Sequence, residues 1–304
     1  MRFRISLVLL SVFAVSCGGL ERITHHRPSS DEHRGQPKNP NHDPKKPKPG
    51  RDNPPTCPAD RIPDLTGTPG AGGDYLRPVV TASCTATEFV MSSNGMPSYT
   101  YVSRTPNPLS PQDWHFRVTL TPKIAAQPTS IRGLLSIVGF SVTGLPIFTP
   151  IEAAMPAREA FGDPNYNGRL DVCKGHTAPF FSYHLHAIDT AATCNLGPDP
   201  IVGYALDGFP IYGSRGCLDR GCKQVVTFQS SYVQTGDPTT NAWDAYTYIA
   251  NDDPTKLDEC NGRIGPDGTY RYYATSAWPY VIGCFAGTVT SQTGAAAQPM
   301  PAMG

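Results

Sequence analysis

Residues 170–187 have the sequence LDVCKGHTAPFFSYHLHA, and residues 257–274 have the sequence LDECNGRIGPDGTYRYYA. The two stretches align without a gap, 87 residues apart, and share the pattern Leu-Asp-x-Cys-x-Gly, then a proline, a tyrosine and a final alanine. Upstream of them, FSVTGLPIF (140–148) and YALDGFPIY (204–212) share a Gly-x-Pro-Ile-aromatic core. These matches predict two degenerate internal repeats that pack together as one domain.

Short segments rich in β-branched and aromatic residues recur along the chain, separated by turn signals such as Asp207-Gly208 and Asp267-Gly268. The 29 glycines and 32 prolines exclude a helical bundle or a coiled coil. The helix candidate is residues 151–161, and Pro156 interrupts it. We therefore expect a mainly β fold, an antiparallel β domain with long loops stapled by disulfides. The expected strands cover residues 88–92, 99–103, 115–121, 134–142, 181–187, 201–206, 224–228, 245–249, 269–274 and 280–285.

The first 17 residues have the features of an export signal. Arg2 and Arg4 precede an apolar run over residues 5–15, which is too short to span a membrane. The run ends at Ala14-Val15-Ser16-Cys17, which resembles a bacterial lipobox in which the cysteine is acylated. We therefore predict a signal peptide over residues 1–17, lipidation of Cys17 and a lipoprotein of the outer membrane or cell surface. Ordinary cleavage, giving a secreted or periplasmic protein, is the alternative.

Residues 18–56 are predicted to form a disordered stalk. Eight prolines, eight Lys or Arg and four histidines lie between Gly18 and Pro55, with almost no apolar residue after Ile23. Such a segment buries too little surface to offset its ordering entropy. The folded domain is expected over residues 57–290, and residues 291–304 are predicted to be a disordered tail.

Charge and hydropathy exclude two classes of partner. The net charge of the whole chain is zero, which argues against a nucleic-acid partner. Beyond the first twenty residues no segment is apolar enough to span a bilayer, so we expect membrane contact only through the lipid anchor. From residue 57 onward Asp and Glu outnumber Lys and Arg, and a mildly acidic domain tolerates a cation. The sequence identifies no protein or polysaccharide partner.

Eight cysteines remain besides Cys17, and an even number in an exported chain is typical of a disulfide framework. Many pairings of eight cysteines are possible. The repeat aligns Cys173 with Cys260, and each has one further cysteine downstream in its own half. The most economical hypothesis pairs Cys173 with Cys194, Cys260 with Cys284, Cys217 with Cys222, and Cys57 with Cys84.

Three histidines of the folded part, His176, His184 and His186, fall within eleven residues. Residues two apart in a strand point to the same face, so His184 and His186 project together. Gly175 permits a tight turn, and a disulfide at Cys173 would fix the loop so that it returns His176 to that face. Three imidazoles are a typical ligand set for zinc or copper. The alternative is a His-x-His pair on a solvated strand without metal.

Carboxylates and the second repeat refine this metal prediction. Asp171 or Asp207 is a candidate fourth ligand. The positions that correspond to the three histidines in the second half are Arg263, Arg271 and Tyr273, which are poor ligands for a transition metal. We therefore predict one metal site, with a degenerate copy.

The stretch CKGH (173–176) and the stretch YHLH (183–186) together resemble the signature of the YHYH-domain family, named for its Tyr-His-Tyr-His strand. Further stretches are similar to the same family: SNGMP (93–97), ALDGFPIYG (205–213), LDECNG (257–262) and PYVIGCF (279–285). The resemblance covers roughly residues 84–287. The chain departs from the pattern at Leu185, which replaces the second Tyr. Since the family is largely uncharacterised, the resemblance implies a related fold and an exported context but no reaction.

Asp163, Asn165 and Asn167 have the spacing that opens a calcium-binding loop, with Gly168 at its turn and Asp171 as a further oxygen ligand. Lys174 stands where such a loop carries a bidentate Glu. A calcium site is therefore a second metal hypothesis, and ordinary Asn/Asp/Gly turn chemistry is its alternative.

Three functions follow from these observations. The first is a copper- or zinc-binding envelope protein that serves in storage, delivery or sensing. The second is a metal-dependent hydrolase or oxidase that uses an open coordination position. The third is a surface interaction or adhesion module without metal. The sequence has no nucleophile elbow, phosphate loop or dinucleotide fingerprint, so we expect no nucleotide cofactor and favour the first function over an enzyme.

Overall fold

The computed structural model describes residues 56–152, 161–179, 181–188, 194, 200–289 and 294–295. The predicted signal peptide, Cys17, almost all of the stalk, most of the helix candidate and nearly all of the tail lie outside these residues. Within them, no helix has the length and apolar character needed to cross a membrane. The described part is mainly β, as the sequence predicts.

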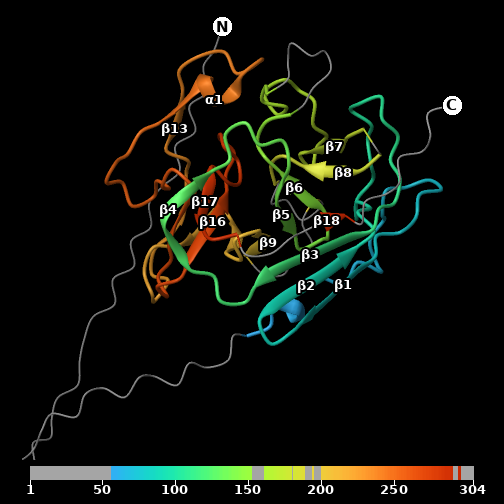
Figure 1. Cartoon of the computed structure of the whole chain (residues 1–304), viewed down its shortest axis with the longest axis horizontal. Coiled ribbons are helices and arrows are strands. Elements are labelled where there is room, and N and C mark those ends of the chain that lie inside the picture. Colours follow the sequence, from blue (N-terminus) through green and yellow to red (C-terminus); the bar gives the residue numbers. More distant parts are fainter. Residues whose placement is uncertain are drawn as a thin grey trace, which may run out of the picture. The chain divides into compact units, whose positions relative to one another are not determined.

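An eight-stranded sheet forms the centre of the fold (Figure 1). Its two central strands are β5 and β9, which pair antiparallel with Phe140 opposite Tyr204. The sheet is mixed, since β8 pairs parallel with β6 and β16 pairs parallel with β10. The strand order is β15 (Gly262–Ile264), β16 (Tyr270–Ala274), β10 (Pro210–Gly213), β9 (Ile201–Ala205), β5 (Ile137–Ser141), β6 (Pro146–Phe148), β8 (Tyr183–Leu185) and β7 (Gly175–Thr177).

The two halves of this sheet use the same strand pairing. On one side of the centre, β5 pairs with β6, β6 with β8, and β8 with β7. On the other side, β9 pairs with β10, β10 with β16, and β16 with β15, in the same orientations. The register also agrees: His176 faces His184 in one edge hairpin, and Arg263 faces Arg271 in the other. The pairing therefore gives the sheet an approximate two-fold symmetry about the β5–β9 pair.

A second sheet covers one face of these central strands. It contains β1 (Val80–Cys84), β2 (Glu88–Ser93), β3 (Trp114–Thr119) and β18 (Gly294–Ala295). Alternate residues of β2 and β3 are buried. The Phe116 ring stacks on Phe140 with 4.7 Å between centroids, and the Phe89 ring meets Tyr204 edge-on at 5.1 Å. Since each buried aromatic ring contributes about 1.5–3 kcal/mol, this cluster holds the two sheets together.

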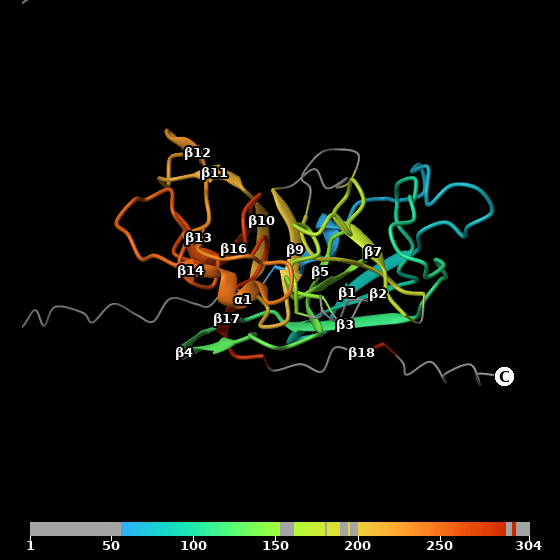
Figure 2. The same cartoon turned by 90° about the horizontal axis from the view of Figure 1, so that it is seen from above.

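The remaining elements are short and lie around the central sheet. β4 (Ile124–Ser130) pairs with β17 (Cys284–Gly287), and β13 (Tyr232–Gln234) pairs with β14 (Tyr246–Tyr248). β11 (Arg215–Cys217) and β12 (Val225–Thr227) form a hairpin that projects beside β10 (Figure 2). The one α-helix of the described residues is α1 (Ala242–Ala245), and a 3-10 helix, η1, covers Pro58–Arg61.

The strands expected at residues 88–92, 115–121, 201–206 and 269–274 correspond to β2, β3, β9 and β16. The strand predicted at residues 99–103 is wrong, because this stretch forms a loop. Its aromatic residues pack against the β7–β8 hairpin instead of joining a sheet: the hydroxyl of Tyr99 donates to that of Tyr183, and the hydroxyl of Tyr101 bonds that of Thr177. The strands that the sequence patterns did not predict are β1, β4, β6, β7, β10, β11, β13, β15 and β18. Apart from β1 and β4, these strands are four residues long or shorter, which is too short to show a period.

Four disulfides join the cysteines in the pairs that the economical hypothesis expects, Cys57–Cys84, Cys173–Cys194, Cys217–Cys222 and Cys260–Cys284. Cys173 lies two residues before β7, and Cys260 lies two residues before β15. Each edge hairpin of the central sheet therefore starts next to a covalent cross-link.

Candidate metal centre

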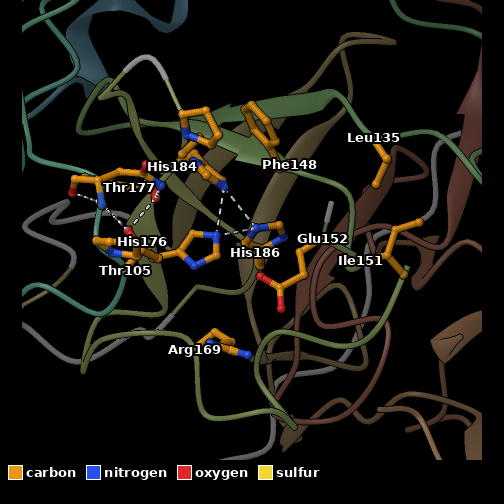
Figure 3. A pocket seen from close by; sticks show the side chains of 14 residues that line it. Thr105, Leu135, Phe148, Ile151, Glu152, Arg169, His176, Thr177, His184 and His186 are labelled. Atoms are coloured by element: carbon orange, nitrogen blue, oxygen red, sulfur yellow. Dashed lines mark hydrogen bonds between the residues drawn. The ribbon is translucent and has the colours of Figure 1, made fainter. Parts of the chain in front are cut away.

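The imidazoles of His176, His184 and His186 converge in the structure. His176 faces His184 across the β7–β8 hairpin, and His186 follows β8 on the same face as His184. The Nε2 atoms lie 3.1 Å apart for His176 and His184, 3.1 Å for His176 and His186, and 3.0 Å for His184 and His186 (Figure 3). All three side chains are buried. Their nitrogen atoms form a group that could hold a metal ion.

The structure differs from the expectation in where His176 lies. The residue occupies the middle of strand β7, not a loop. The Asp171 carboxylate sets the turn that leads into this strand: its Oδ1 accepts hydrogen bonds from the backbone N–H groups of Cys173 (2.9 Å) and Gly175 (3.1 Å). Its Oδ2 accepts a 2.6 Å bond from the Tyr183 hydroxyl.

Neither carboxylate proposed as a fourth ligand joins the histidines in the group that could hold a metal. Tyr183 precedes His184 in the strand and points to the opposite face, so its partner Asp171 lies away from the imidazoles. Asp207 belongs to the second half, where it accepts bonds from the Tyr272 hydroxyl (2.5 Å) and the Gly287 N–H (2.9 Å). Both side chains hold backbone and tyrosine groups in place instead.

The other ring nitrogen of two histidines faces a backbone carbonyl. Nδ1 of His186 lies 2.7 Å from the Thr149 oxygen, and Nδ1 of His184 lies 3.4 Å from the Ser182 oxygen. Because a carbonyl only accepts, these contacts assign the ring proton to Nδ1 and leave the Nε2 lone pair for the cluster. Among the described residues, Nδ1 of His176 has no hydrogen bond that meets the usual geometry. Burial lowers the pKa of this ring, and the nearby Arg169 backbone acts against that lowering.

Burial keeps all three imidazoles uncharged at neutral pH. It lowers the pKa of His176 to about 4 and the pKa of His186 to about 3. Burial, and then the repulsion that a protonated His184 would meet from a proton on either of the other two rings, lower the pKa of His184 well below its usual value. Three neutral imidazoles directed at one point are the protonation state that a transition metal requires.

A hollow of about 230 Å³ opens beside the imidazoles. Phe148, Leu135 and Ile151 supply apolar walls, and the Phe148 ring lies 4.1 Å from the His184 ring. Glu152 and Arg169 add charged groups to the lining (Figure 3). No sequence pattern predicts these five residues as part of the site, because they come from separate loops and strands and no motif connects them to the histidines.

The residues of the calcium hypothesis have protein partners in the structure. Asp163 accepts bonds from the hydroxyls of Tyr280 (2.6 Å) and Tyr246 (3.2 Å) and from two backbone N–H groups of its own turn. The Lys174 ammonium donates to Asn165 at 3.1 Å. The amide of Asn167 donates to the Thr239 carbonyl. Hydrogen-bonded turn chemistry therefore accounts for this stretch.

Comparison with known families finds a match. A family model described as YHYH protein matches residues 115–287, which is more than half of the chain and includes both edge hairpins. Comparison with curated proteins and with solved structures finds no match.

Gly175→Ala is expected to destabilise the protein by about 1–3 kcal/mol, because a new Cβ would lie 2.3 Å from the buried Tyr183 hydroxyl. Gly67→Ala is the matched control, since a Cβ there meets nothing within 4 Å. Urea denaturation of the two variants checks this. The added Cβ would push the Tyr183 hydroxyl away from Asp171. Equal stability of Gly175→Ala and the wild type would therefore show that the Asp171–Tyr183 hydrogen bond does not stabilise the hairpin.

The histidine cluster is expected to make the metal-free protein less stable as the pH falls from about 7 to about 4. In the unfolded chain the imidazoles gain protons near pH 6.5, whereas the buried ones stay neutral down to about 4 or 3. The stabilisation is therefore full above about pH 6.5 and declines toward the folded pKa values, by about 1.4 kcal/mol per pKa unit and histidine.

Denaturation of wild type and His186→Gln over this pH range measures the effect. The variant is expected to show a weaker loss, and His115→Gln, an exposed histidine outside the cluster, is the control that keeps the wild-type loss. Comparing variants separates the histidines from the buried Asp163, Asp171 and Asp207, where burial raises the pKa and acts in the opposite direction. An identical pH dependence in His186→Gln and wild type would contradict the account.

Proposed function

The chain belongs to the YHYH family, and from this premise we propose that it is an exported protein that binds one transition-metal ion, copper or zinc, through the Nε2 atoms of His176, His184 and His186. The observation that carries the proposal is the triangle of buried Nε2 atoms, 3.0–3.1 Å on each side.

The size of this triangle suits a metal ion. With 3.0–3.1 Å between the Nε2 atoms, one ion could reach all three nitrogens at the usual Zn–N distance of about 2.0–2.1 Å. Three nitrogens on one side of an ion would leave its coordination positions on the other side free for further ligands. The hollow beside the imidazoles has room for a water molecule or a small ligand there.

The donor set favours copper or zinc over calcium or magnesium. Neutral imidazole nitrogens suit zinc and copper, whereas calcium and magnesium prefer oxygen ligands. The carbonyls of Thr149 and Ser182 orient two of the rings through Nδ1, and metal-binding histidines are commonly oriented by a backbone carbonyl in this way. Rings held by such contacts need little rearrangement when an ion binds.

Storage, delivery or sensing of the metal in the cell envelope is the role that we propose. Four disulfides support an oxidising, exported location. The basic start, the short apolar run and the lipobox-like sequence before Cys17 support a lipid anchor at the outer membrane or cell surface.

A metal-dependent hydrolase or oxidase is the second candidate. The lining of the hollow favours it, because Glu152 supplies a buried carboxylate and Arg169 supplies a guanidinium beside the open face of the cluster. A metal-bound water next to a carboxylate is the minimal arrangement for metal-assisted hydrolysis.

Untagged protein loaded with Zn²⁺ or Cu²⁺ and then dialysed is expected to retain about one metal equivalent in the cluster, and His184→Ala is expected to lose it, with an affinity at least about 100-fold weaker. Mass spectrometry of the metal content and calorimetric titration measure this. His115→Ala is the control, because His115 is exposed and lies outside the cluster.

The histidines of residues 18–56 are present in every variant, so the difference between variants reports the cluster alone. Equal metal content in His184→Ala and wild type would refute the assignment and leave a surface interaction module as the simpler function.

A further inference from the structure

The second half of the central sheet carries a hollow at the position that corresponds to the histidine hollow. The shared strand register matches Phe148 with Tyr212, His184 with Arg271, and His186 with Tyr273. These three counterparts all line one hollow of about 500 Å³. The two halves of the sheet therefore each carry a hollow at the same position. In the second half, Arg271 and Tyr273 line it in place of two of the imidazoles.

Three arginines line this second hollow, Arg215, Arg220 and Arg271. Arg215 and Arg220 are exposed, and no carboxylate of the described residues forms an ion pair with either. They lie on the β11–β12 hairpin, whose connecting turn is closed by the Cys217–Cys222 disulfide. The cross-link therefore holds two unpaired positive charges at the rim of the hollow.

Asp219 also lines the hollow, but its carboxylate belongs to the same turn. It accepts hydrogen bonds from the backbone N–H groups of Gly221 (2.9 Å), Lys223 (3.2 Å) and Gln224 (2.9 Å). These contacts occupy both of its oxygens. Asp219 therefore shapes the turn that presents the two exposed arginines.

Arg271 is the buried member of the set, with 8% of its surface exposed. Its guanidinium stacks on the Tyr212 ring at 4.5 Å, and its Nη2 pairs with Asp267. Its Nε is buried and has no hydrogen-bond partner. A buried donor without a partner destabilises the folded protein, because it has lost its hydrogen bonds to water. Arg271 therefore has a donor that a ligand oxygen can satisfy.

The Asp267 carboxylate is the replaceable partner of Arg271. Its side chain is 60% exposed, and its Oδ1 also accepts the backbone N–H of Thr269 (2.9 Å). The carboxylate can therefore give up Arg271 and still keep a backbone partner and contact with water. Nε and Nη2 together form the edge of a guanidinium that binds a carboxylate or phosphate through two parallel hydrogen bonds. At present Asp267 contacts only Nη2 of this edge.

We propose that this hollow binds the oxyanion group of a small molecule, a phosphate or a carboxylate. The anion displaces Asp267 and accepts hydrogen bonds from Nε and Nη2 of Arg271, while Arg215 and Arg220 add two charges from the hairpin. The proposal goes beyond the metal function and does not depend on it.

Titration of metal-free protein with inorganic phosphate, and separately with citrate, tests the site at constant ionic strength by calorimetry. Saturable binding is expected for at least one of them, and which anion binds identifies the preferred group. The double variant Arg215→Gln/Arg220→Gln, whose exposed side chains can change without disturbing the fold, is expected to bind at least tenfold more weakly. Asp267→Asn removes the competing carboxylate and is expected to bind several-fold more tightly.

Two controls make the test specific. Lys223→Gln removes one positive charge from the same turn at a residue that does not line the hollow, and it is expected to keep wild-type affinity. His184→Ala is expected to keep anion binding as well. The proposal is overturned if neither anion binds saturably, if the double arginine variant or Asp267→Asn binds like the wild type, or if His184→Ala abolishes binding.

Discussion

One buried carboxylate organises the site. Asp171 accepts two backbone N–H groups and the Tyr183 hydroxyl, and these three bonds fix the turn before β7 and its register against β8. That register places His176 opposite His184. Burial raises the pKa of Asp171, whereas the three donors lower it. Loss of any of these donors would leave an oxygen of the buried Asp171 carboxylate without a hydrogen bond, which is unfavourable. The folded protein therefore strongly favours this one arrangement of the turn.

The second half of the sheet uses the same device. Asp258 accepts the backbone N–H groups of Cys260 (3.0 Å) and Gly262 (2.9 Å) and a bond from the Tyr270 hydroxyl. An added Cβ at Gly262 would meet that hydroxyl, as one at Gly175 would meet the hydroxyl of Tyr183. The two halves thus share the strand pairing and this hydrogen-bonded turn, whereas the three histidines of one hairpin are replaced by Arg263, Arg271 and Tyr273 in the other. Three imidazoles suit a cation in one half, and arginines suit an anion in the other.

Much of the site could be predicted from the sequence, because the residues that reveal it lie close together in the chain or recur in both internal repeats. Strand alternation alone places His184 beside His186, and the aligned cysteines identify the covalent pair next to each hairpin. Strand alternation also explains why Asp171 does not join the histidines: it bonds to Tyr183, whose side chain points to the opposite face. Glu152 and Arg169 reach the hollow only through the packing of separate loops, which no spacing in the sequence encodes. Lipidation at Cys17 stays a prediction, since that residue lies outside the described part of the chain.

The central claim is that three imidazoles bind one metal ion together. X-ray absorption spectroscopy of protein loaded with a single equivalent of Zn²⁺ or Cu²⁺ tests this most directly, since imidazole rings give a recognisable multiple-scattering pattern. The account predicts three imidazole nitrogens at about 2.0–2.1 Å for zinc, with the remaining positions filled by oxygen. A spectrum with one imidazole or none, or with the ion bound by oxygen alone, would contradict it.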